Sequence, residues 1–181
     1  MRVIIIIASL LFCANAWPSA ATGVAAVAPH AQASDPLSPC DLLTVQQVAE
    51  IAGVSVIEAR RRVDIREDVA ARREGRAPAP GIICSYETRA DFGAIQVVLP
   101  PAVQRTVAAY RANRDANLRK LPAVVRPVPG LGEDAWMSSG IALHVLVRDG
   151  LTFRISLQHP TDMAASRELL MRLARAALAR L

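Results

Sequence analysis

Two cysteines, Cys40 and Cys84, are the residues whose chemistry is easiest to define from this sequence. A disulfide between them would close a loop of about 45 residues, for which the chain-entropy model gives about 4 kcal/mol of stability. A metal site would need a second cysteine or a histidine close to either one, and neither is present. A redox site would need the Cys-x-x-Cys spacing, which is also absent. We therefore expect a structural disulfide between Cys40 and Cys84.

The histidines, serines and acidic residues form no recognisable catalytic pattern. His144 is expected in a strand and His159 in a turn, and the sequence pairs neither with a serine, acid or cysteine nucleophile. The Gly-x-Ser-x-Gly motif of a nucleophile elbow is absent. Glu133 and Asp134 are adjacent, so on a strand they would face opposite sides of the sheet. We predict no catalytic residue, no cofactor-binding residue, no metal ligand and no cofactor.

A glycine-rich segment, residues 128–136, supplies a candidate interaction loop that consists of Gly130, Leu131, Gly132 and Trp136. Backbone N–H groups in such a loop could cradle an anion. The segment, however, does not open a helix and lacks the Lys-Ser/Thr pair of a phosphate loop. Acidic residues directly after the glycines would also repel a phosphate. The alternative, which we prefer, is a tight turn that delivers Trp136 to the core.

The N-terminus has the features of an export signal. Arg2 precedes an apolar run, residues 3–12, that is too short to span a bilayer. Small residues at the required spacing allow cleavage after Ala33 or after Ala16, and we expect a signal peptide at 1–33.

Lipidation and an uncleaved anchor are the alternatives to simple removal of this segment. Cys13 lies in a loose lipidation motif, but the bulky Phe12 precedes it where a small residue is expected. Removal of the signal peptide would also remove Cys13 and leave two cysteines, Cys40 and Cys84, in an oxidising compartment. An even number of cysteines there agrees with a disulfide.

The remaining chain, residues 34–181, is expected to fold as one domain, because about 150 residues is a common domain size. Hydrophobic residues make up 52% of the sequence, enough for a core, and aromatic residues only 4%. The formal charge is +5, and Lys120 is the only lysine among mostly arginine cations. Acids interrupt the arginines, as in residues 60–76, which breaks up a basic patch. We expect no nucleic-acid partner and no transmembrane helix in the mature chain.

Local patterns predict three helices and several hairpins. Thr44 is expected to cap a helix that ends at Gly53. Asp149-Gly150 is expected to form a two-residue hairpin turn, since both turn positions need positive φ. Residues 57–71 fit either a strand or a helix, and residues 72–81 fit a solvated loop. The expected helices are 45–52, 102–120 and 163–181, and the expected strands are 54–56 (a start only), 82–88, 94–99, 134–138, 141–148 and 151–158.

Two of the helices have apolar stripes, and the strands are joined as hairpins. The stripe of the middle helix consists of Val103, Val107, Tyr110 and Leu118. That of the last helix consists of Met163, Ser166, Leu170, Leu173, Ala177 and Leu181. No regular alternation of strands and helices is present. The predicted fold is therefore α+β, a mostly antiparallel sheet of five to six strands packed with three helices.

Three short motifs resemble a known group of domains. They are Cys40-Asp41-Leu42-Leu43-Thr44, Cys84-Ser85-Tyr86 and the glycine segment 128–136. In combination they resemble uncharacterised bacterial cell-envelope domains, many of which are actinobacterial lipoproteins. The resemblance covers residues 40–157 and implies an exported α+β domain with a disulfide. It implies no activity and no functional residues, and the chain departs from the group in lacking a clear lipobox.

The export signal, the size and the lack of a catalytic pattern predict a periplasmic or secreted, non-catalytic accessory domain. It would bind an envelope protein partner or a small ligand, and it should present a groove or an exposed apolar patch. One alternative is a hydrolase or metal-dependent enzyme, in which a pocket brings His144 or His159 to an acid or a metal. The other is a cationic domain that docks on an anionic envelope or lipid surface.

Overall fold

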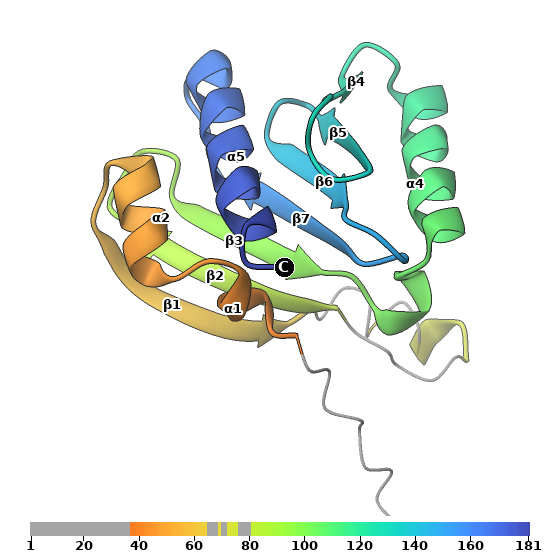
Figure 1. Cartoon of the computed structure of the whole chain (residues 1–181), viewed down its shortest axis with the longest axis horizontal. Helices are drawn as coiled ribbons and strands as arrows, with labels where there is room; N and C mark the ends of the chain where they lie inside the picture. Colours follow the sequence, from red (N-terminus) through yellow and green to blue (C-terminus); the bar gives the residue numbers. More distant parts are fainter. Residues whose placement is uncertain (1–36, 65–68, 70–71, 76–80) are drawn as a thin grey trace, which may run out of the picture. The chain divides into compact units, whose positions relative to one another are not determined.

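A single antiparallel sheet organises the part of the chain that the computed structural model describes, residues 37–64, 69, 72–75 and 81–181 (Figure 1). Its strand order is β1-β2-β3-β7-β6-β5-β4. The strands are β1 (Val56–Val63), β2 (Ile82–Thr88), β3 (Ala94–Leu99), β4 (Val125–Pro127), β5 (Asp134–Ser138), β6 (Ala142–Leu146) and β7 (Thr152–Leu157). The helices are α1 (Pro39–Leu42), α2 (Val45–Ala52), the 3-10 turn η1 (Ala102–Gln104), α4 (Val107–Lys120) and α5 (Met163–Leu178). The α+β prediction is confirmed, with seven strands in place of five to six.

The first face of the sheet is covered by helices and holds the main core. α1 and α5 pack on this face, and α2 packs against α5 and β1 (Figure 1). Val97, Val145 and Ile155 point into this layer from the central strands and are fully buried. Leu170 and Leu173 of α5 meet them from the other side. Every second residue of the central strands therefore belongs to this core, and the residues between them are directed to the second face.

The expected disulfide between Cys40 and Cys84 is present and fastens α1 to β2. Their Cα atoms are 5.1 Å apart, and Cys84 is completely buried. Tyr86, two residues along the same strand, donates its hydroxyl to the carbonyl oxygen of Leu43. Burial raises the pKa of Tyr86 above its usual range, so the hydroxyl stays a donor. Two links thus hold the N-terminal helices on the sheet.

Two local predictions are confirmed in detail. Thr44 caps α2 and forms a capping box with Gln47, and Gly53 ends the helix in the left-handed conformation with φ of 68°. Asp149 and Gly150 both have positive φ, 52° and 82°, as a tight turn between β6 and β7 requires.

Several predictions about element boundaries need correction. Pro39, expected in an extended lead-in, is the first residue of α1, which Ser38 caps. The expected helix 102–120 is divided, because Thr106 caps a new helix that begins at Val107. The ambiguous segment 57–71 is a strand as far as Val63. Strand β4 was not expected at all.

Burial corrects two of the predicted stripes. Leu118 of α4 and Met163 of α5, both expected to be buried, are 46% and 42% exposed. The other α5 predictions from Ser166 to Ala177 are buried, together with Leu169 and Ala174. The expected signal peptide 1–33, Cys13 and the residues between 64 and 81 other than 69 and 72–75 lie outside the described part of the chain.

Candidate functional site

The second face of the sheet is covered only in part among the described residues. Strand pairing places Val98, Arg154, His144 and Trp136 in one row across β3, β7, β6 and β5. Residues directly opposite each other in antiparallel strands point to the same face, so these four side chains share the second face. Only the Trp136 end of the row is packed beneath α4, through Tyr110.

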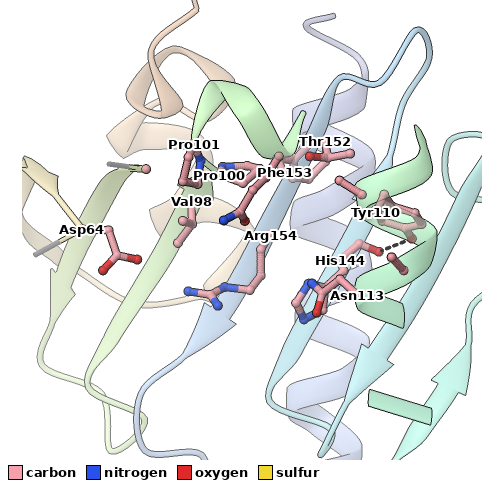
Figure 2. A pocket seen from close by; sticks show the side chains of 14 residues that line it. Asp64, Val98, Pro100, Pro101, Tyr110, Asn113, His144, Thr152, Phe153 and Arg154 are labelled. Carbon is pink, nitrogen blue, oxygen red and sulfur yellow. Dashed lines mark hydrogen bonds between the residues drawn. The ribbon is translucent and has the colours of Figure 1, made fainter. Parts of the chain in front are cut away.

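A cleft of about 540 Å³ lies between α4 and the rest of this row (Figure 2). Its volume falls within the range of small-molecule sites, about 300–1,000 Å³. The apolar part of its lining comes from the end of β3, the segment after it and α4: Val98, Pro100, Pro101, Ala109 and Ala112. The polar part comes from the residue after β1 and from α4, β6 and β7, and it includes Asp64, Asn113, His144 and Arg154. The cleft therefore combines an apolar wall with a polar floor.

Polar contacts near Tyr110 fix the helix that forms one wall. The Tyr110 hydroxyl lies 3.3 Å from the carbonyl oxygen of His144 on β6 (Figure 2). It also lies 3.1 Å from the carbonyl oxygen of Asp134 on the neighbouring strand β5. Arg114, one turn further along α4, places its Nη1 2.5 Å from the Asp134 carboxylate. Burial, followed by the negative charge of Asp134, raises the pKa of Tyr110 above its usual range. The hydroxyl remains protonated and keeps α4 at a fixed distance from the sheet.

His144 is held as a neutral ring on the cleft floor. Its imidazole stacks on the indole of Trp136, with ring centroids 3.8 Å apart and 3° between the planes. Burial, and to a smaller extent the charge of Arg154, lowers the pKa of His144 to about 3. Near neutral pH the ring therefore offers hydrogen-bonding groups but no charge.

The structure brings one serine to this histidine. The Oγ atom of Ser138 lies 3.4 Å from Nε2 of His144, on the adjacent strand. A general base works best when its pKa is near the working pH, and His144 is several units too acidic for that task. The long contact and the weak base favour a structural hydrogen bond over activation of a nucleophile. His159, the other histidine considered from the sequence, is exposed and does not line the cleft.

The candidate interaction loop contains both buried and exposed residues. Leu131 and Trp136 are only 2% and 1% exposed, whereas Gly130 and Gly132 are on the surface. A Cβ atom on Gly132 would lie 2.2 Å from the carbonyl oxygen of Leu146, so the turn passes directly against β6. The segment thus acts as a turn that leads Trp136 into the sheet, and contact through the two glycines stays a prediction.

The described part of the chain contains no group of three or more His, Cys, Asp or Glu side chains placed to hold a metal ion. No helix within the described ranges is long and apolar enough to cross a membrane.

The sequence analysis named His144 as a candidate pocket residue, but it missed the polar cleft residues Arg154, Asn113 and Asp64, although the sequence contains one signal for them. Arg154 lies in the middle of β7 between the buried residues Phe153 and Ile155. A charged residue inside an apolar central strand indicates a sheet face that is not packed into the core. Asn113 and His144 carry no comparable local signal.

The chain matches no protein-family model, no curated protein and no solved structure. Its functional assignment therefore depends on the chemistry of the cleft.

Proposed function

We propose that this protein is an exported, non-catalytic accessory domain that binds a small amphipathic ligand in the cleft between α4 and the sheet. The observation that carries the proposal is the cleft itself, in which an apolar wall faces a polar floor. An open cleft over central strands leaves apolar surface in water, which folding would normally remove. A bound ligand would cover this apolar surface, which accounts for the presence of the cleft.

The cleft favours a small ligand over a protein partner. A protein interface of standard size buries about 800 Å² on each partner and is usually broad. The apolar side chains here instead line a concave space, with Val98 and Pro100 at one side and Ala112 of α4 at the other. A narrow concave site of this kind suits a molecule with a short hydrocarbon part.

Export is supported by the sequence and by the disulfide. The apolar run at residues 3–12 has the length of a signal-peptide core. The Cys40–Cys84 bond is of a kind that persists in oxidising compartments. Within the proposal the domain works in the periplasm or outside the cell, as part of a bacterial cell envelope.

Binding of N-phenyl-1-naphthylamine, a neutral dye that fluoresces in apolar sites, tests the proposed function. The oxidised full chain should bind the dye saturably, with one site per chain. Ala112→Phe places a larger side chain in the cleft from the exposed side of α4 and should abolish binding. Ala108→Phe is the matched control, because Ala108 is exposed on the same helix and does not line the cleft.

Circular dichroism should be the same for the three proteins, since both substitutions are at exposed helical positions. A chain that does not bind the dye, or that binds it equally with Phe at position 112 and at position 108, would rule out the cleft as a ligand site.

A further inference from the structure

Two charged side chains lie among the described residues that line the cleft. Among the lining residues that the structure describes, Arg154 on β7 is a cation and Asp64 after β1 is an anion. Figure 2 shows the Arg154 side chain between Asp64 and the His144 and Asn113 end of the cleft. The polar floor is therefore positive at its centre and negative toward one side.

The groups beside Arg154 are suited to a ligand that accepts hydrogen bonds. The Oδ1 atom of Asn113 already accepts a hydrogen bond from Nδ2 of Asn117 at 2.8 Å, so the amide offers its N–H groups to the cleft. Arg154 has five N–H donors in a planar fork and no acceptor. The Arg154 guanidinium can therefore interact with another group of the protein and still donate hydrogen bonds to a ligand carboxylate.

Most of the other described lining residues are apolar, although Gln104 of η1 also lines the cleft. Val98, Pro100 and Pro101 on one side and Ala109 and Ala112 on α4 present hydrocarbon surface to the cleft. Proline has no backbone N–H, so the two prolines of this apolar wall supply no main-chain donors. A hydrocarbon chain or ring is the chemistry that this surface can desolvate favourably.

From this arrangement we infer that the cleft selects an amphipathic monocarboxylate, with the carboxylate at Arg154 and Asn113 and the hydrocarbon part along α4 and the two prolines. This inference rests on the proposed function and adds the class of ligand to it. A single negative charge is favoured over two, because Arg154 is the only cation among the lining residues that the structure describes. A cationic head group at the same place would be repelled by the positive charge of Arg154.

Three ten-carbon probes that differ only in head group test the inference: decanoate, decan-1-ol and decyltrimethylammonium. Each is titrated against the dye-loaded full chain near neutral pH, where the carboxylic acid is ionised. Decanoate should displace the dye at a concentration about tenfold lower than the alcohol, because a charge-assisted pair with arginine adds to the shared hydrocarbon contact. The cationic probe should be the weakest of the three.

Substitutions of the arginine give an independent check on the head group. Arg154→Gln should remove the preference for decanoate and leave displacement by decan-1-ol within about twofold of the parent, whereas Arg154→Lys should keep part of the preference. Arg148→Gln, in the exposed turn between β6 and β7, removes the same charge outside the cleft and should change neither.

The outcomes separate the two proposals. Equal displacement by the three probes in the parent chain would overturn the monocarboxylate inference and leave the ligand site in place. A preference for decanoate that survives Arg154→Gln in a chain with unchanged circular dichroism would also overturn it. Failure of the dye to bind at all would overturn the proposed function and this inference with it.

Discussion

The imidazole of His144 stacks face to face on the indole of Trp136, with 3.8 Å between the ring centroids. The two rings come from directly opposite positions on β6 and β5. Trp136 is buried under α4, while His144 borders the cleft, so the pair connects the packed part of the second face to its open part. A protonated imidazole would gain about 1 kcal/mol from the indole. The loss of hydration and the charge of Arg154 outweigh this gain, and the ring stays neutral.

The neutral His144 predicts that the domain loses stability in mild acid. Below pH 6.5, the ordinary pKa of histidine, the unfolded chain takes up a proton here, whereas the folded chain does so only near pH 3. The free energy of unfolding should therefore fall as the pH decreases through this window, by up to about 2 kcal/mol at pH 5 from this residue. Denaturant unfolding at several pH values measures the fall.

The variant His144→Phe isolates that contribution, because it keeps an aromatic ring on Trp136 and removes the titrating group. The stability of the variant relative to the parent should be constant above pH 7 and should rise steadily as the pH is lowered toward 5. A difference that does not change with pH would contradict the account of His144.

The two glycines of the turn before β5 should respond differently to alanine. Gly132 has φ of 61°, and a Cβ atom there would lie 2.2 Å from the carbonyl oxygen of Leu146. Gly132→Ala should therefore cost about 3 kcal/mol, since backbone atoms must move. Gly130 has φ of 76° and nothing within 4 Å of a Cβ atom, so Gly130→Ala should cost only about 1 kcal/mol. Equal losses in guanidinium unfolding would show that the turn does not press on β6.

Removal of the disulfide should destabilise the domain by about 4 kcal/mol, because Cys40 and Cys84 are separated by 44 positions and the bond restricts the unfolded chain. The double variant Cys40→Ala/Cys84→Ala, compared with the oxidised parent by denaturant unfolding, measures this loss. When protein purified without a reductant is denatured and titrated with a thiol reagent, neither Cys40 nor Cys84 should react. Recovery of both thiols would contradict the disulfide.

The Tyr110 hydroxyl should control how tightly α4 is held against the sheet. Tyr110→Phe removes its hydrogen bonds to the carbonyl oxygens of Asp134 and His144, a loss of about 1 kcal/mol. Amide hydrogen exchange in α4 should then accelerate about fivefold. Tyr86→Phe, which breaks the link to Leu43 on the other face, is the control and should leave α4 unchanged. Equal exchange in α4 for the two variants would contradict this role.

The parts of the fold that sequence reasoning predicted best depend on local backbone chemistry. Thr44 and Gly53 define the ends of α2, and Asp149-Gly150 defines a hairpin, because each acts through its own φ and ψ angles and its nearest neighbours. The four-residue helix α1 was missed because it is too short to show a period. Leu118 was assigned to the core by its helical spacing, yet α4 contacts the sheet mainly through Val107 and Tyr110 in its first turns.

The cleft could not be predicted in the same way, because its residues come together only through the strand order. β7 lies between β3 and β6, although β3 and β7 are separated by the whole of α4, β4, β5 and β6. This insertion places Arg154 beside Val98 on one side and His144 on the other. No local pattern encodes that neighbourhood, and its one local sign, the charge of Arg154 within an apolar strand, was overlooked in the sequence.

The most direct test of the central claim is a crystal structure of the oxidised chain grown with decanoate. The account predicts electron density for one decanoate in the cleft, with its carboxylate within hydrogen-bonding distance of Arg154 and its alkyl chain against Ala112 and the two prolines. A well-ordered cleft without decanoate, or a carboxylate bound away from Arg154, would contradict it.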